Sequence, residues 1–444
     1  MKITFLPGEK WYGPEAIVGY NYPMDDKAEL TICLEPCSCG NQTNPLLLST
    51  AGRYIFCQSG FTAVFKGGHI EISAKNGEID YFDQGKNLRG AFKAAASAHF
   101  PANGELPPEA FFTSPQLNTW IELIYDQNQK DILHYANRAV AEGIKPGVLM
   151  IDDLWSNYYG KWDFDRKKFP DPKGMIEELH NLGFKVILWI CPFVSLDSAE
   201  YRLLSGKGCF VKDPNTDQPR HVHWWNGISA VLDFTNPTDV EWFKQQTDFL
   251  VNEYGVDGFK FDAGDAGFYN ENDKTYAPIL PTGQTELWAK FGLNYPYNEY
   301  RACYGCAGLP LVQRLCDKSH SWDYSGLGAV LPNSIMQGLL GYAFACPDMV
   351  GGGSFADFLP GAKQFDPELF VRYCGASTLL PMIQFSAAPW RVLDEEHYAA
   401  VKSLMAQREE YLPLIMSLVK EAAKMCIRDR CCSALHRPTP LCGK

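Results

Sequence analysis

The sequence contains no run of eighteen apolar residues, although 46% of its 444 residues are hydrophobic. A membrane-spanning helix needs about 20 mostly apolar residues, so no membrane partner is expected. The first sixteen residues lack the apolar stretch of a signal peptide. We therefore expect a cytoplasmic location.

Basic residues are also scarce, with 40 Lys and Arg against 52 Asp and Glu and a net charge of −12. Because no Lys/Arg run is present, nucleic acid is a poor candidate partner. The fifteen cysteines, without a signal peptide, indicate reduced thiols in a cytosolic enzyme. The sequon at 41–43 then has no consequence.

Metal-binding motifs are equally sparse. Cys303 and Cys306 form one C-x-x-C pair with no second pair at matching spacing, and His221 and His223 form a lone H-x-H in a polar stretch. The triple glycine at 351–353 lacks the Lys and Ser/Thr of a phosphate loop. We expect no metal and no organic cofactor. The three glycines instead predict a βα loop whose backbone passes close to a site.

The rest of the sequence shows two different patterns, one in each part of the chain. Residues 1–108 hold short alternating runs separated by Gly, Pro and Asn, which predicts a small antiparallel β domain. Residues 109–424 alternate strand-like and helical patterns, which is typical of a parallel sheet. About eight strands favour a (β/α)8 TIM barrel. A doubly wound sheet is the alternative, made weaker by the lack of an early G-x-G-x-x-G.

The expected elements of the second part are as follows. Strands are expected at 120–125, 147–151, 185–190, 230–234, 256–261, 300–304, 311–315, 342–346 and 381–385, and helices at 130–142, 173–182, 239–253 and 395–423. The stretch Met425–Lys444 continues neither pattern and holds four of the fifteen cysteines. We interpret it as a non-native or disordered tail.

Aspartates follow four of the apolar strands, at Asp152, Asp262, Asp317 and Asp348. Catalytic groups of TIM barrels lie at the carboxyl ends of strands, so these side chains should converge. Converging carboxylates cannot all ionise with ordinary pKa values, and a pair of ionised and protonated acids is what glycoside hydrolysis needs. The competing interpretation is that each such Asp only caps a helix.

From about residue 120 to 391, the chain resembles glycoside hydrolase family 31, the retaining α-glycosidases. The motifs occur in the family's order: Ile151-Asp152-Asp153-Leu154-Trp155, Asp257-Gly258-Phe259-Lys260-Phe261-Asp262, Arg301 before Asp317, and Pro347-Asp348-Met349-Val350-Gly351-Gly352. The resemblance implies a sugar substrate and no cofactor. The family also has a larger N-terminal β-sandwich and β domains after the barrel.

The resemblance assigns the two catalytic roles. Asp262 matches the nucleophile, and Asp317 matches the acid/base, although Cys316 replaces the usual Gly before it, and Asp323 is the alternative acid/base. Retention would require the two carboxyls to lie about 5–5.5 Å apart. We expect two cations, Lys260 and Arg301, to lower the pKa of Asp262.

The remaining site residues are expected to hold the sugar. The resemblance places Asp152, Trp189, Lys260, Arg301 and Asp348 at sugar-binding positions, and Asp153 and Trp322 lie within the same motifs. Lys260 also shares a strand face with Asp262 by the two-residue period.

The predicted function is that of a retaining exo-acting α-glycosidase acting on an oligosaccharide or glycoside. A His usual after the eighth strand is missing, and the runs at 259–264, 347–352 and 384–391 resemble a branch associated with α-galactosidase activity. The alternatives are a catalytically silent sugar-binding member of the fold and a transglycosylase. A homo-oligomer is left open.

Overall fold

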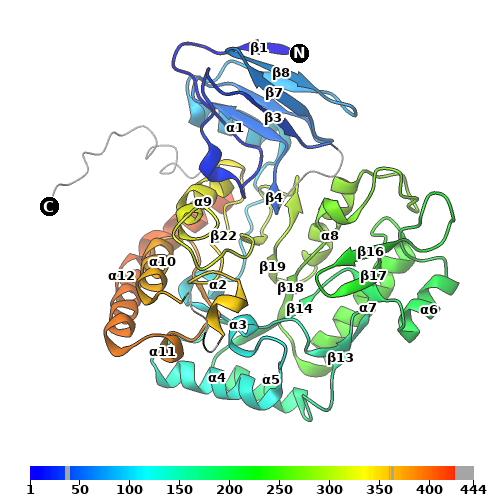
Figure 1. Ribbon diagram of the computed structural model, residues 1–444, viewed down its shortest axis with the longest axis vertical. Coiled ribbons are helices and arrows are strands. Elements are labelled where there is room, and N and C mark those ends of the chain that lie inside the picture. The colour runs from blue at the N-terminus through cyan, green and yellow to red at the C-terminus, as the bar shows by residue number, and fades with distance from the viewer. Residues whose placement is uncertain (36–40, 360, 362–364, 426–444) are drawn as a thin grey trace.

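The structure is a computed structural model that describes residues 1–35, 41–359, 361 and 365–425. In Figure 1 the N-terminal sheets lie above a ring of strands and helices. The predicted tail lies, from residue 426 onward, outside the described residues.

Two four-stranded antiparallel sheets form the N-terminal part, which confirms the expected β texture. The first has the order β1-β8-β7-β3 (Lys2–Thr4, His69–Ser73, Thr62–Lys66, Leu30–Cys33), and the second β2-β5-β6-β9 (Trp11–Tyr12, Leu46–Ser49, Tyr54–Phe56, Asp80–Phe82). Helix α1 (Leu88–His99) follows them. In β7 and β8 inward residues alternate with outward ones, as expected of strands with one buried face.

Eight parallel strands form the central sheet and confirm the TIM barrel. Their order is β22-β21-β19-β18-β14-β11-β10-β23 (Ala345–Cys346, Val312–Arg314, Tyr297–Tyr300, Gly258–Phe261, Lys185–Ile190, Val148–Ile151, Gln116–Asn118, Gln384–Phe385). A bridge between Met349 and Gln384 joins the two ends of this order. Gly258 permits the close approach of β18 to β19, because an added Cβ would lie 1.8 Å from the Tyr297 carbonyl oxygen.

Helices connect most successive barrel strands. They are α4 (Gln129–Ala141), α5 (Pro172–Asn181), α7 (Pro237–Tyr254), α8 (Pro281–Gly292), α9 (Val330–Leu339), α10 (Pro367–Thr378) and, after β23, α12 (Glu395–Met425). Asp171 and Asn236 cap α5 and α7, each followed by a proline at the first helical position. Between β19 and β21 the connection instead contains the short strand β20 (Cys303–Tyr304).

Three of the predicted barrel strands are wrong. The strand predicted at 300–304 shares only Tyr300 with β19, and its Cys303 and Tyr304 form β20, outside the eight-stranded sheet. Residues 120–123 form the short helix α3 (Trp120–Leu123), and the barrel strand is the preceding β10. The Asn118 carboxamide oxygen accepts from the Trp120 backbone N–H at 2.8 Å and so starts the turn. The sequence Gln-Leu-Asn of β10 lacks an apolar pattern because two of its side chains are polar and buried.

The third wrong strand is the one predicted at 230–234. Its first residues belong to β17 (Gly227–Val231), in an antiparallel sheet with β15 (Phe193–Ser195) and β16 (His221–Trp224). This sheet is an insertion between β14 and α7, together with α6 (Ala199–Gly206), and lies at the right of Figure 1. An apolar run of this length cannot by itself distinguish a barrel strand from an inserted one.

The N-terminal part and the barrel share a core. Leu46, Leu88 and Phe100 belong to the same buried cluster as Leu149 and Phe261 of the barrel strands. Strand β4 (Gln42–Thr43) also pairs with β20 in parallel. The predicted boundary at 108 falls between α1 and α2 (Ala110–Thr113).

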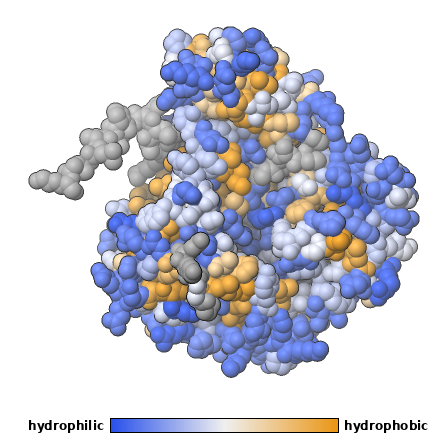
Figure 2. Space-filling view, viewed as in Figure 1, coloured by the Kyte–Doolittle hydropathy of each residue, from blue (hydrophilic) through white to orange (hydrophobic). Residues whose placement is uncertain are grey.

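The surface is mainly hydrophilic on the face in Figure 2, where hydrophobic residues form separate patches. Within 1–35, 41–359, 361 and 365–425, no helix combines the length and hydropathy of a membrane crossing. The nine cysteines of these ranges are free thiols, Cys303 and Cys306 included.

Candidate active site

A cavity of about 420 Å³ opens at the carboxyl ends of the barrel strands. Seven of the nine predicted site residues line it: Asp152, Asp153, Trp189, Lys260, Asp262, Arg301 and Asp317. They come from four consecutive strands and from the loop after β21, residues far apart in sequence. The site is therefore assembled by barrel closure, as in TIM-barrel enzymes.

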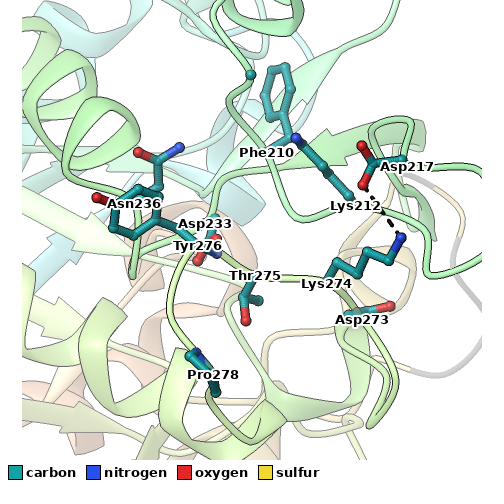
Figure 3. A pocket seen from close by; sticks show the side chains of 11 residues that line it. Phe210, Lys212, Asp217, Asp233, Asn236, Asp273, Lys274, Thr275, Tyr276 and Pro278 are labelled. Carbon is teal, nitrogen blue, oxygen red and sulfur yellow. Dashed lines mark hydrogen bonds and ion pairs between the residues drawn. The ribbon is translucent and has the colours of Figure 1, made fainter.

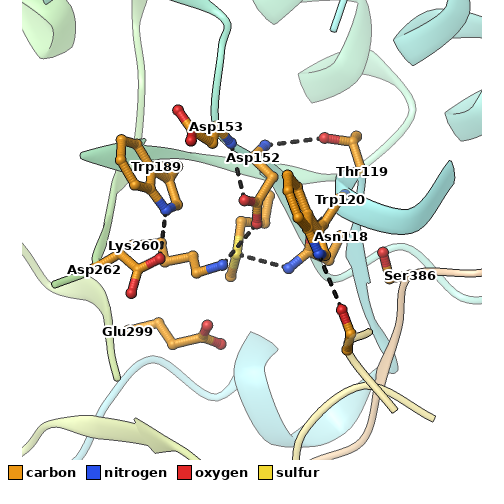
Figure 4. A network of polar contacts seen from close by, with 12 residues as sticks. Asn118, Thr119, Trp120, Asp152, Asp153, Trp189, Lys260, Asp262, Glu299 and Ser386 are labelled. Carbon is orange, nitrogen blue, oxygen red and sulfur yellow. Dashed lines mark hydrogen bonds and ion pairs between the residues drawn. The ribbon is translucent and has the colours of Figure 1, made fainter. Parts of the chain in front are cut away.

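Asp262 follows β18 and lies almost buried at the wall of this cavity. Its Oδ2 accepts a hydrogen bond from the Trp189 indole at 2.7 Å, and its Oδ1 accepts one from the Ala263 backbone N–H at 2.8 Å. The Arg301 Nε lies 3.1 Å from Oδ1. These contacts fix both carboxylate oxygens, and Figure 4 shows the one from Trp189.

The electrostatic surroundings keep Asp262 ionised. Burial alone would raise its pKa, but the charges of Arg301, Lys260 and Arg314 and the Trp189 hydrogen bond lower the pKa to about 2. At neutral pH the carboxylate is therefore a preformed anion in a cavity wall.

Asp152 and Lys260 form a buried ion pair deep in the cavity. The Lys260 Nζ lies 2.7 Å from the Asp152 Oδ2, and both side chains are almost inaccessible to solvent. The register of β14, β18 and β19 places Trp189, Lys260 and Glu299 beside one another. Figure 4 shows this cluster.

Asp153 lies beside Asp152 but has different partners. It accepts hydrogen bonds from the Tyr159 hydroxyl and, at 2.6 Å, from the Asn226 carboxamide. Burial and the charge of Asp152 raise the pKa of Asp153 to about 7. Near neutral pH this group can therefore donate as well as accept a hydrogen bond.

Asp317 is half-exposed, with a side-chain exposure of 50%. Arg314, the last residue of β21, binds it at 2.7 Å and binds Asp348 at 2.8 Å through the same Nη1. The Gly353 backbone lies against Asp317, since an added Cβ would approach that carboxylate to 2.8 Å. The glycine loop thus passes close to the site, as predicted.

Two predicted sugar contacts do not line the cavity. Asp348 is fully buried, and its Oδ2 accepts a hydrogen bond from the Lys318 backbone N–H. Burial raises the pKa of Asp348, as does the charge of Asp317, although Arg314 opposes this. The Trp322 ring is 52% exposed, and its indole donates to Asp366. Asp348 therefore orients Arg314, and Trp322 lies at the surface, outside the lining of the cavity.

Sequence reasoning missed the role of Arg314 and of Glu299. Glu299 is fully buried beneath the cavity, where burial raises its pKa to about 7 against the charges of Arg314 and Lys260. Its Oε2 accepts a hydrogen bond from the Gln384 carboxamide. A charged residue inside a strand was the available signal for both.

The aromatic residues at the cavity rim were also missed. Trp120, Tyr125 and Phe355 contact one another edge to face. The Trp225 ring lies 4.8 Å from the guanidinium carbon of Arg301, which itself contacts Asp262. Tyr125 and Trp225 lie in turns, and Trp120 and Phe355 begin helices of only four residues, so no periodic pattern marks a function.

A second cavity, of about 450 Å³, lies near the inserted sheet (Figure 3). None of the predicted site residues lines it. Its buried carboxylate, Asp233, accepts hydrogen bonds from the Tyr276 backbone, Thr235 and Gln284. These hydrogen bonds engage both oxygens of the Asp233 carboxylate, and none of the aspartates that follow the barrel strands at 152, 262, 317 and 348 lies in this cavity.

The first cavity can support acid–base and nucleophilic chemistry. It combines an ionised carboxylate, a half-exposed carboxylate and a buried Asp–Lys pair that can bind hydroxyl groups. Aromatic rings at its rim offer surfaces for stacking.

Comparison with known proteins identifies the barrel. A family model described as the TIM-barrel domain of glycosyl hydrolases family 31 matches residues 105–310. The myogenesis-regulating glycosidase of Mus musculus is 32% identical over 348 residues, covering 76% of this chain and 48% of that protein. The alpha-xylosidase XylQ of Lactiplantibacillus pentosus is 28% identical over 238 residues, covering 50% and 29%.

A solved structure shares the fold. The family 31 dextranase of Flavobacterium johnsoniae, complexed with glucose, superposes with a TM-score of 0.78 at 16% identity and covers 96% of this chain and 56% of that one. This chain spans less than half the length of the two curated relatives. From the matched barrel domain, the relatives and the strand-end motifs, the chain belongs to glycoside hydrolase family 31 and so to a family of α-glycosidases.

Proposed function

We propose that this protein is a retaining, exo-acting α-glycosidase in which Asp262 is the nucleophile and Asp317 the acid/base. The observation that carries the proposal is the position of the Asp262 carboxylate in the cavity wall, bound by the Trp189 indole and the Arg301 guanidinium. These neighbours also lower its pKa, which keeps the nucleophile ionised. Asp317 supports it because it lines the same cavity and remains open to solvent on one side.

In the first step, an Asp262 oxygen attacks the anomeric carbon while the glycosidic C–O bond breaks. The proton of Asp317 passes to the leaving oxygen. In the second step, Asp317 takes a proton from water, whose oxygen attacks the anomeric carbon and releases Asp262. Two inversions at one carbon give net retention.

The buried polar groups of the cavity support action on a terminal sugar. Asp152 and Lys260 are buried there, and Asp153 is bound by Tyr159 and Asn226. These groups would bind the hydroxyls of one ring, while the aromatic rim would contact the leaving group.

We further propose that terminal α-galactosides are the preferred substrates. The support is the resemblance of the runs at 259–264, 347–352 and 384–391 to the branch associated with that activity. One relative is named as an α-xylosidase, so xylosides are the natural comparison.

The test is the release of aryl alcohol from aryl α-galactoside, α-glucoside and α-xyloside, with Asp262→Ala as control. We expect turnover that falls by at least about a thousandfold in the variant, with a first product of α configuration by NMR. A β-configured product would exclude retention. Specific sugar binding without turnover by the folded protein would instead indicate a catalytically silent member of the family.

A further inference from the structure

A segment of the N-terminal part enters the barrel at the place where two active-site strands separate. Strands β19 and β21 pair at Glu299 with Val312 and at Tyr300 with Gln313. The next residues, Arg301 and Arg314, are not paired with each other. Strand β4 lies there, with Gln42 beside Cys303 of β20.

The Gln42 side chain is fully buried and bridges the two separated backbones. Its Nε2 lies 2.5 Å from the Arg301 carbonyl oxygen and 2.7 Å from the Arg314 carbonyl oxygen. A carboxamide has two N–H donors, so both are used. The Gln337 carboxamide donates to the Gln42 Oε1 at 3.2 Å and thereby fixes which way the amide points.

Each of the two bridged residues binds one of the carboxylates. Arg301 lies 3.1 Å from Asp262, and Arg314 lies 2.7 Å from Asp317. One amide therefore joins the backbones behind both ion pairs.

We propose that Gln42 is a positioning residue that sets the separation of Asp262 and Asp317 through the backbones of Arg301 and Arg314. The inference rests on the proposed function. Retention needs carboxyls about 5–5.5 Å apart, and a misplacement of about 1 Å can cost roughly a hundredfold in rate. A residue of the N-terminal part thus completes a site made of barrel residues.

The test compares two substitutions of similar shape on the same segment of the full chain. Gln42→Met keeps the side-chain length and removes both donors. Asn44→Leu is the matched control, because Asn44 is also buried and donates to a barrel carbonyl, that of Leu340, at 2.9 Å. Within the described residues, the Asn44 side chain forms no hydrogen bond with Arg301 or Arg314.

We expect Gln42→Met to lower kcat for the best aryl α-glycoside at least tenfold, with KM changed less than threefold. Because Arg301 helps to lower the pKa of Asp262, its displacement should move the acid limb of kcat/KM to higher pH. Asn44→Leu should lower the melting temperature but leave kcat and the acid limb within twofold and 0.3 pH unit of the wild type. If Gln42→Met is insoluble, Gln337→Leu should give the same changes to a smaller extent.

Equal losses of kcat in the two variants, or an unmoved acid limb in Gln42→Met, would overturn the proposal. Binding of 1-deoxygalactonojirimycin separates this outcome from a failure of the proposed function. The affinity of this cation depends on ionised Asp262, so its pH dependence reports the same group without turnover. If the protein has no turnover but the pH dependence of inhibitor binding shifts only in Gln42→Met, the positioning role would be supported and the glycosidase function rejected.

Discussion

At the scale of single residues, the anion at Asp262 depends on a few directed contacts. Burial opposes its charge, and the neighbouring cations with the Trp189 N–H outweigh burial. A hydrogen bond to a charged group contributes about 1.5–3 kcal/mol. The indole is therefore part of the electrostatics of the site as well as one of its walls.

Trp189→Phe should lower kcat/KM by roughly 10- to 100-fold, because it removes a charge-assisted hydrogen bond of about 1.5–3 kcal/mol. Steady-state kinetics with an aryl α-glycoside measures this. Trp162→Phe is the matched control: Trp162 is equally buried, and its Nε1 has no partner within the described residues. Similar losses in both variants would mean that packing, rather than the hydrogen bond, supports activity.

At the scale of elements, helix α7 carries a buried acid near its start. The Asp239 Oδ1 accepts a hydrogen bond from the Phe210 backbone N–H at 3.0 Å, and the Cys209 thiol also hydrogen-bonds to the Asp239 carboxylate. Burial raises the pKa of Asp239 to about 7, and the charge of Asp233 adds to this. The helix therefore holds a group whose ionisation opposes folding.

The sign of the pH effect follows from this raised pKa. Between about pH 4 and 7 the folded state binds the proton and the unfolded state does not, so stability falls as pH rises. Asp239→Asn keeps the oxygen for Phe210 and should add up to about 4 kcal/mol to the free energy of unfolding at pH 8, and nothing near pH 3.

Urea denaturation at the two pH values measures the change, with Glu241→Gln, exposed on the same helix, as control. An equal gain at pH 3 and pH 8, or a gain in the control, would contradict the assignment to Asp239.

At the scale of the whole molecule, the N-terminal part and the barrel are one packing unit. One buried cluster contains residues of both, and the Tyr342 hydroxyl donates to the Thr43 carbonyl across their junction at 2.6 Å. Separating them would expose apolar surface and leave buried polar groups without partners.

We therefore expect a single calorimetric unfolding transition, with a ratio of calorimetric to van't Hoff enthalpy near one, although chains of this length often show several transitions. Two resolved transitions, with the lower one moved selectively by Asn44→Leu, would show instead that the two parts unfold independently.

The sequence alone is enough to identify the aspartates at the strand ends and the alternation of strands and helices that predicts the barrel. Asp152 and Asp262 follow apolar strands, and the parallel sheet must bring such ends together. Strand β10 was not predicted because two of its three residues are polar, and β17 was predicted as a barrel strand because a short apolar run has no distinctive period.

Tertiary structure alone decides which groups act on those aspartates. Gln42, Arg314 and the rim aromatics lie near the carboxylates only after the N-terminal segment and the loops have packed. Hydrogen bonds and Coulomb forces act over a few ångströms, whereas Gln42 and Arg301 are 259 positions apart in the chain. A sequence pattern records what neighbours along the chain require, and only folding makes these distant residues neighbours.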